Sequence, residues 1–181
     1  SRITRGLLLH FYRILADLEE NMQKPMVDVI IPTYKPTKRL TKLIESLEEQ
    51  TYPVHKIIIM NTEERYWNTF LYGEKFMKVR ENVHVTHLSK MEFDHGRTRQ
   101  WGVEKSHADY FICMTDDAIP ADERLVEELL KPLLDGKAEF SYARQLPNED
   151  CGEIEKFTRD FNYPAESCIK SLADLERLQI K

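Results

Sequence analysis

The stretch Val27–Pro36 reads VDVIIPTYKP and decides the fold class of this chain. Val27–Pro32 is a short β-branched run, which predicts a buried strand, and Thr33–Pro36 predicts the loop that follows it. Similar short apolar runs predict further strands over residues 56–60, 83–87, 110–115 and 139–142. Helical patterns lie between them, after Thr37, within 61–80, and over 97–107 and 120–134.

Strands that are apolar on both faces and alternate with helices predict an α/β fold, a mostly parallel sheet with helices on both faces. In such sheets, ligands bind at the carboxyl ends of the strands. Four segments follow those ends and are therefore candidate binding loops: residues 33–35, 61–63, 88–99 and 116–117.

The composition excludes several classes of protein. The 181 residues are 41% hydrophobic and 31% charged, which is typical of a globular domain with a real core, and the net charge of −5 disfavours nucleic-acid binding. Three cysteines at residues 113, 151 and 168 indicate buried or incidental thiols in a reducing compartment, not a disulfide scaffold or a zinc finger. The chain has neither a Walker A loop nor a GxGxxG motif.

The N-terminal residues 1–25 predict an amphipathic helix whose apolar stripe is Leu7, Phe11, Ile14 and Leu18. Packing on its own domain is the simpler interpretation, and contact with a membrane surface or a partner protein is the alternative. No signal peptide is recognisable, so the predicted location is the cytoplasm, including the inner face of the membrane.

Two adjacent carboxylates, Asp116 and Asp117, end the fourth predicted strand. A helix cap with a solvated turn would explain them. The alternative is a hard-cation site, because Mg²⁺ binds through one or two carboxylates and completes its shell with substrate phosphates. Arg99 could clamp the same phosphates, and Gly96 would allow the backbone to approach closely. These features predict a site for a departing nucleoside diphosphate.

Several motifs in order resemble glycosyltransferase family 2, and bacterial rhamnosyltransferase-like members most closely. They are VDVIIPTYKP, LEEQTYP, KIIIMNT, FDHGRTRQWGVE, YFICMTDDAIPADE, YARQLP and FNYPAES, which together cover about residues 26–181. The resemblance implies a glycosyltransferase A fold, a nucleotide-sugar donor, Mg²⁺ or Mn²⁺ held by a DxD-type motif, and inversion at the anomeric carbon. It also implies a dTDP- or UDP-linked donor, a glycan or lipid-linked acceptor and a place in bacterial polysaccharide biosynthesis.

The resemblance also implies roles for individual residues. Asp117 matches the metal-binding Asp of the DxD motif. Donor contacts are implied for Pro32, Thr33, Tyr34, Asn61, Gly96, Thr98, Arg99 and Asp116. The sequence departs from the family pattern twice: Thr115 replaces the first Asp of DxD, and Asn61 stands where many members have an acidic residue that accepts from the pyrimidine N–H.

No catalytic base is identified, because in this family it lies on a later motif, beyond Lys181. The predicted organisation is an N-terminal helix (1–25), a nucleotide-sugar-binding domain (26–148) and the truncated start of an acceptor region (149–181). A non-catalytic nucleotide-sugar-binding or interaction module is the alternative function, and a nucleotidyltransferase is a lesser one. Five aromatic side chains are interpreted as core or packing residues in preference to platforms for a sugar, namely Trp101, Tyr142, Phe157, Phe161 and Tyr163.

Overall fold

The computed structural model describes residues 24–73, 80–147 and 151–174, so the predicted helix over residues 1–25 lies almost wholly outside the described part. The chain divides into two compact units. The first contains the described residues up to Ile44 together with Val54–Ala118, and the second contains Glu45–Pro53 together with the described residues from Ile119 onward.

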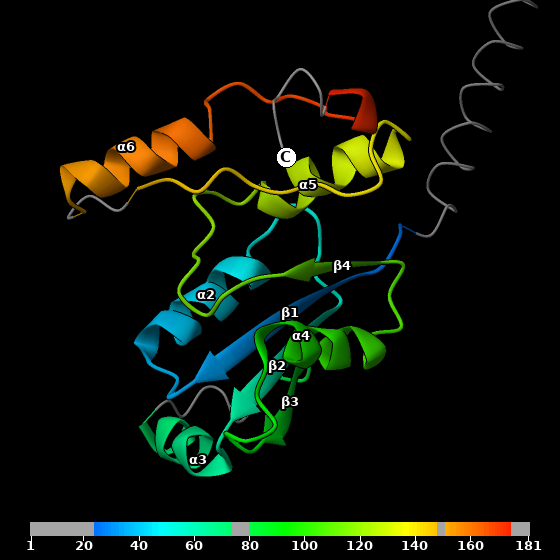
Figure 1. Ribbon diagram of the computed structural model, residues 1–181. Coiled ribbons are helices and arrows are strands. Elements are labelled where there is room, and N and C mark those ends of the chain that lie inside the picture. Colours follow the sequence, from blue (N-terminus) through cyan, green and yellow to red (C-terminus); the bar gives the residue numbers. More distant parts are fainter. Residues whose placement is uncertain (1–23, 74–79, 148–150, 175–181) are drawn as a thin grey trace, which may run out of the picture. The chain divides into compact units, whose positions relative to one another are not determined.

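The first unit is built on a four-stranded parallel sheet (Figure 1). Its strands are β1 (Val27–Tyr34), β2 (Lys56–Thr62), β3 (Val83–Leu88) and β4 (Tyr110–Cys113), in the spatial order β3-β2-β1-β4. The predicted parallel α/β arrangement is thereby confirmed. Both β1 and β2 extend further than the sequence predicted, because Thr33 and Tyr34 pair with Asn61 and Thr62 and continue the ladder.

Helices cover both faces of this sheet. They are α2 (Lys38–Glu48), α3 (Glu64–Gly73) and α4 (His95–Glu104). Alternate residues of a strand point to opposite faces. On the α4 side, Ile30 and Met60 are buried against Trp101 of that helix. On the other side lie the fully buried Val29, Ile31, Ile57 and Ile59, and α2 supplies the buried Leu40, Leu43 and Ile44.

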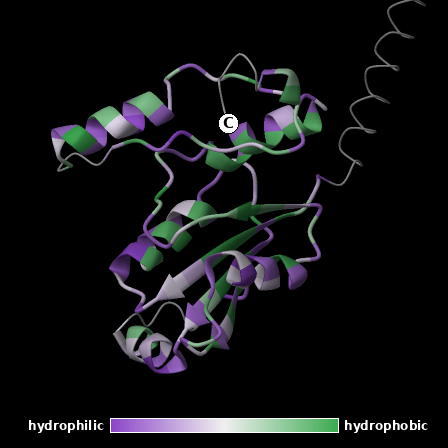
Figure 2. Cartoon of the chain, viewed as in Figure 1, coloured by the Kyte–Doolittle hydropathy of each residue, from purple (hydrophilic) through white to green (hydrophobic). Residues whose placement is uncertain are grey.

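Figure 2 shows the change of polarity along β1, whose hydrophobic body gives way to a pale arrowhead at the carboxyl end. The last three residues of this strand are Pro32, Thr33 and Tyr34. The apolar body anchors the strand in the core, and the more polar end carries the side chains that a ligand can meet.

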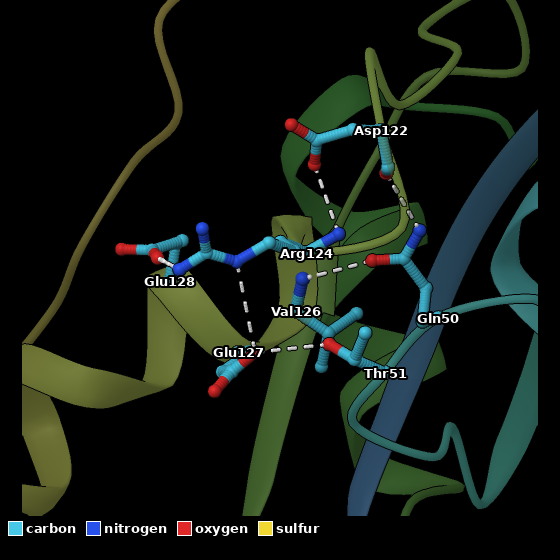
Figure 3. A network of polar contacts seen from close by, with 7 residues as sticks. All are labelled: Gln50, Thr51, Asp122, Arg124, Val126, Glu127 and Glu128. Atoms are coloured by element: carbon cyan, nitrogen blue, oxygen red, sulfur yellow. Dashed lines mark hydrogen bonds and ion pairs between the residues drawn. The ribbon is translucent and has the colours of Figure 1, made fainter.

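The second unit is organised around α5 (Leu125–Leu134), and it also contains α6 (Glu153–Asn162) and a 3₁₀ turn, η2 (Leu172–Asp174). Figure 3 shows how the start of α5 is held. The Gln50 amide nitrogen donates to the carbonyl oxygens of Ser46 and Asp122, both at 3.0 Å, and its Oε1 accepts from Val126 N at 3.1 Å. Thr51 Oγ1 adds a hydrogen bond to Glu127 Oε2 at 3.0 Å. Gln50 therefore satisfies a helix-start N–H that has no partner within the helix.

One predicted strand and one predicted helix start in this unit are wrong. The predicted fifth strand over 139–142 does not form in those described residues, because Ser141 donates instead to the Leu129 carbonyl oxygen at 2.7 Å and ties the segment to α5. The helix predicted from Pro120 begins only at Leu125. Asp122 accepts from Arg124 N at 2.9 Å in a turn before the helix, which delays its start.

Cys113 is exposed, which fits the incidental of the two kinds of thiol expected, because β4 lies at the edge of the described sheet with β1 as its neighbour. One expectation about burial is wrong: Tyr142, Phe157 and Phe161 are exposed and not packed in the core, and the rings of Phe157 and Phe161 stack on each other at 6.3 Å between centroids. In the described residues, no helix is long and apolar enough to span a membrane.

Candidate functional site

Three polar side chains stand side by side toward the carboxyl ends of three adjacent strands, β1, β2 and β3. The strand register pairs Asn61 of β2 with Thr33 of β1 and with His87 of β3. Paired residues of neighbouring strands point to the same face of a sheet, so the three form a row. Thr33 and Asn61 are buried and His87 is exposed, and the row therefore runs from the interior to the surface.

The carboxylate pair adjoins this row through one hydrogen bond. Thr33 Oγ1 donates to Asp116 Oδ2 at 2.5 Å, although the two residues are 83 positions apart in the sequence. Asp116 and Asp117 occupy the centre of a turn that is closed by Ala118 N donating to the Thr115 carbonyl oxygen at 3.2 Å. Asp117 is exposed, and none of the described residues forms a hydrogen bond or ion pair with its carboxylate. The turn thus separates an anchored carboxylate from one that faces solvent.

A cluster of aromatic and cationic side chains follows the ends of β1 and β2. The rings of Tyr34 and Tyr66 meet edge to face at 5.3 Å, and Lys35 Nζ lies 5.2 Å from both ring centroids. A hydrogen bond with Tyr34, and then the positive charges of Arg65 and Lys35, lower the pKa of Tyr66. Lys35 has a φ of 55°, a left-handed conformation that a non-glycine residue adopts at an energetic cost.

Helix α4 begins with a cap made by Asp94. Its Oδ1 accepts from Gly96 N at 3.0 Å and Arg97 N at 2.8 Å, and its own N–H donates to Thr98 Oγ1 at 3.2 Å. The hydrogen bond from Arg97 N is the main reason why the pKa of Asp94 is lowered. Thr98 is fully buried, and its hydroxyl accepts the hydrogen bond from Asp94 N at the start of the helix. Arg99 is half-buried and donates to the His95 carbonyl oxygen at 2.7 Å.

The structure thus brings together Thr33, Tyr34, Asn61 and Asp116, with Asp117 beside them. It places Gly96, Thr98 and Arg99 at a separate element, the start of α4, and Pro32 one residue before Thr33 on the opposite face of β1. A direct donor contact of each residue stays a prediction.

Sequence reasoning missed His87 of the row and Tyr66 beside it, whereas Glu63 lies in the candidate loop 61–63 but was given no role of its own. His87 is the last residue of the third predicted strand and the next-to-last residue of β3, and that position was the signal that could have identified it. Tyr66 offered no such signal, because its placement depends on the left-handed φ of 67° at Glu63.

The residues present fit a metal ion that is bound by one or two carboxylates and by the phosphates of its substrate. Among the described residues, no group of three or more histidine, cysteine, aspartate or glutamate side chains could hold an ion by itself. Asp117, with Asp116 one residue away, suits Mg²⁺ or Mn²⁺, since such ions can bind through one or two carboxylates together with substrate phosphates.

Comparison with known proteins finds one matching family model and two similar curated proteins. The sequence model of the glycosyl transferase family 2 domain matches residues 28–177. The chain is 30% identical over 156 residues to the O-antigen chain rhamnosyltransferase RfbN of Salmonella typhimurium, covering 86% of this chain and 48% of that protein. It is 30% identical over 159 residues to the O-antigen chain rhamnosyltransferase WbaN of Salmonella anatum, covering 87% of this chain and 49% of that protein. This chain therefore spans about half the length of these relatives.

Among solved structures, residues 1–349 of S. aureus TarS in complex with UDP-GlcNAc are similar to this chain at 18% sequence identity and a TM-score of 0.46. The match covers 61% of this chain and 31% of the other.

Proposed function

Because the chain belongs to glycosyl transferase family 2, we propose that it forms the donor-binding half of a metal-dependent inverting glycosyltransferase. The donor is a nucleoside-diphosphate sugar, dTDP- or UDP-linked, and the transferred sugar is rhamnose, as the names of its relatives suggest. The acceptor is a bacterial glycan or lipid-linked saccharide, and the reaction takes place on the cytoplasmic side of the membrane.

One observation carries this proposal: the hydrogen bond of 2.5 Å from Thr33 to Asp116, which fixes the turn that presents Asp117. The nucleoside lies along the ends of β1 and β2, against Tyr34 and Asn61. The diphosphate lies at Asp117, the residue that would hold Mg²⁺ or Mn²⁺, and the ion would supply positive charge to the leaving diphosphate.

The transfer combines three events. An acceptor hydroxyl attacks the anomeric carbon on the face opposite the diphosphate, the bond to the diphosphate breaks, and a base removes the hydroxyl proton. The described residues supply the donor side, where Asp117 and Arg99 stabilise the leaving group. None of the described residues is assigned as this base, and the chain spans about half the length of its curated relatives.

Calorimetric titration of the 181-residue chain with dTDP and UDP, with and without Mg²⁺ or Mn²⁺, tests the proposal. We expect the metal to strengthen binding of one of the two nucleotides. The Asp117→Asn variant should weaken that metal-dependent binding by about 10- to 100-fold, because it removes the charge that pairs with the ion.

Asp109→Asn is the matched control, since Asp109 precedes β4 at the opposite end of the strand and accepts from Met26 N at 2.8 Å. It should leave nucleotide affinity unchanged. Absence of nucleotide binding by the folded chain would contradict the proposal. Metal-dependent binding without sugar transfer by a protein of the relatives' full length would favour the non-catalytic module, and release of pyrophosphate from a nucleoside triphosphate would favour a nucleotidyltransferase.

A further inference from the structure

Strand β3 forms one edge of the described sheet, since β2 is its only neighbour in the order β3-β2-β1-β4 (Figure 1). Two hydrogen bonds show which of its backbone groups face β2. Ile57 N donates to the Asn82 carbonyl oxygen, and Glu63 N donates to that of Leu88, both at 2.8 Å. Because the backbone groups of successive strand residues point to opposite sides, the even-numbered residues of β3 face β2 and the odd-numbered residues face outward.

The outward backbone groups of Val85 and His87 form hydrogen bonds with none of the described residues. Natural sheet edges are commonly protected against pairing with another chain by charged side chains, proline or a bulge. The sequence of β3 is VHVTHL, which contains no proline, lysine, aspartate or glutamate, and its register with β2 is continuous. In the described part of the chain, this edge is therefore open to a further strand.

Two cavities lie along β3, on the side of the sheet that packs against α4. The first has a volume of about 240 Å³ and is lined by Lys56 and Lys105, and we call it the lysine cavity. The second has a volume of about 410 Å³ and is lined by Leu88 and Trp101, and we call it the tryptophan cavity. Thr86 lines both, so the two cavities follow each other along the strand.

The order of the cavities suits alternate side chains of an added strand. Successive side chains point to opposite faces, so residues i and i+2 share a face and lie about 7 Å apart. His84 lines the lysine cavity and Leu88 lines the tryptophan cavity. An antiparallel strand beside β3 runs from Leu88 toward His84, and it therefore passes the tryptophan cavity first.

The lysine cavity favours an acidic side chain. Among the described residues, none forms an ion pair or a side-chain hydrogen bond with Lys56 or Lys105. Asp28 is paired in register with Lys56, but its carboxylate already accepts from Ser106 and contacts His55. Two positive charges without a counterion at one cavity attract an anionic group.

The tryptophan cavity favours an apolar side chain. Its lining includes the buried Met60 and Leu88 and the half-buried Trp101. Two carboxylates, Glu92 and Glu104, also line it, and each already accepts a hydrogen bond within the chain. A leucine-sized side chain would bury apolar surface here, whereas an acidic side chain would be repelled by the two carboxylates.

We propose that β3 accepts an extended segment of a partner protein as an added antiparallel strand. The segment places a large apolar side chain in the tryptophan cavity and, two residues later, an acidic side chain in the lysine cavity. The backbone of the residue between them exchanges hydrogen bonds with Val85 or His87, and antiparallel pairing is slightly more stable per residue than parallel pairing. The inference is independent of the proposed function, because it uses none of the residues assigned to the donor or the metal.

Titration of the 181-residue chain with a synthetic peptide, followed by NMR, tests this inference. The probe is acetyl-Thr-Thr-Leu-Thr-Glu-Thr-Thr-amide, whose leucine and glutamate share one face of an extended strand. We expect the backbone amide protons of Val85 and His87 to exchange rapidly with solvent in the free chain and to become protected in the complex. The amide of Thr86 already faces β2, so its exchange should change little.

Three altered peptides separate strand addition from unspecific binding. N-methylation of the threonine between leucine and glutamate removes an N–H that pairs with β3, and it should weaken binding by at least about 10-fold. Glutamine in place of glutamate keeps the shape without the charge and should weaken binding by about 3- to 10-fold. The reversed sequence keeps composition and charge but exchanges the side chains between the cavities, and it should bind about 10-fold more weakly.

Two variants of the protein test the lysine cavity. The double variant Lys56→Gln/Lys105→Gln should bind the glutamate and glutamine peptides almost equally, because the cavity has lost both charges. Lys38→Gln/Lys42→Gln is the matched control, since both lysines are exposed on α2 and the net charge changes by the same amount. It should keep the preference for glutamate, and both variants should keep the circular dichroism spectrum of the wild type.

Absence of peptide binding, equal affinity of the N-methylated peptide, or unprotected amides at Val85 and His87 in the complex would each overturn the inference. A preference for glutamate that persists in Lys56→Gln/Lys105→Gln would refute the role of the lysine cavity. Protection of the two amides in the free chain that increases with protein concentration would show that a second copy of this chain occupies the edge, and would overturn the assignment to a partner protein. Each of these results leaves the proposed function standing.

Discussion

Asp28 is a fully buried carboxylate in β1, at the end of the sheet opposite the candidate site. Ser106 Oγ donates to its Oδ2 at 2.7 Å, and His55 Nδ1 lies 2.9 Å from its Oδ1. A buried charge is tolerated only when hydrogen bonds compensate for the lost water. Asp28 therefore links β1 to His55, which precedes β2, and to Ser106, which follows α4.

Replacement of Ser106 by alanine should destabilise the chain by about 1–3 kcal/mol, because the buried Asp28 carboxylate loses a donor. Urea unfolding monitored by circular dichroism measures this loss. Ser167→Ala is the control, since Ser167 is exposed and its replacement should change the free energy of unfolding by less than about 0.5 kcal/mol. Equal effects of the two substitutions would show that Ser106 does not stabilise Asp28.

Asp94 gives the fold a dependence on pH. Its pKa is lowered from the ordinary value of 3.8, mainly by the hydrogen bond from Arg97 N. A carboxyl group whose pKa is lower in the folded state stabilises the fold above its unfolded pKa, and this contribution is lost as the pH falls through the folded pKa.

The Asp94→Asn variant keeps a capping oxygen but not the charge. Wild type should be the more stable of the two at pH 7, and the difference should shrink as the pH falls from about 4 toward 2. Urea midpoints at several pH values measure it. A difference that is constant with pH would mean that the charge of Asp94 does not contribute to the cap.

At the scale of elements, α4 approaches the sheet closely at Gly102. A Cβ atom at this position would lie 2.4 Å from Ile30 Cγ2 and 3.3 Å from Met60 Cγ. Glycine is normally a poor helix residue, so its presence here reflects the space between α4 and β1 and not helix propensity.

Gly102→Ala should therefore destabilise the chain by about 1–3 kcal/mol, because the added methyl group overpacks the core against Ile30. Gly73→Ala is the matched control, since a Cβ there would meet nothing within 4 Å. It should be neutral or mildly stabilising. Thermal or urea unfolding measures both, and a stabilising effect of Gly102→Ala would contradict the close packing of α4.

At the scale of the whole molecule, the second unit leaves apolar surface uncovered. α6 has no buried residue, and Phe157 and Phe161 are 72% and 76% exposed. In Figure 2 this helix carries both hydrophobic and hydrophilic residues. In the first unit, by contrast, Phe70 of α3 is buried.

Phe157→Ala should change the free energy of unfolding of the 181-residue chain by less than about 0.5 kcal/mol. Phe70→Ala should cost about 3–5 kcal/mol, because it leaves a cavity in the core. Urea unfolding of the two variants provides the comparison. A large loss for Phe157→Ala would mean that its ring is covered in solution.

Local pattern was sufficient to predict the apolar strands, because β1 and β2 are apolar on both faces and such runs pack only between two layers of helices. It failed for residues 139–142, whose sequence has the pattern of a strand. In the structure the hydrogen bond from Ser141 to the Leu129 carbonyl oxygen ties this segment to α5 instead. Helix α5 was predicted too long at its start, since the turn at Asp122 uses side-chain hydrogen bonds that periodicity does not reveal.

The sequence by itself determined the parallel sheet and the carboxyl edge at which Thr33, Asn61 and Asp117 lie, because the alternation of apolar strands with helices is a local pattern. The family followed from the resemblance of its ordered motifs. Only the tertiary structure decided which atoms meet there. The bond from Thr33 to Asp116 joins residues 83 positions apart, and the amide of Asn61 is oriented by His87 and by the left-handed Glu63. These contacts depend on how neighbouring strands are aligned, and that alignment arises only when the whole sheet is formed.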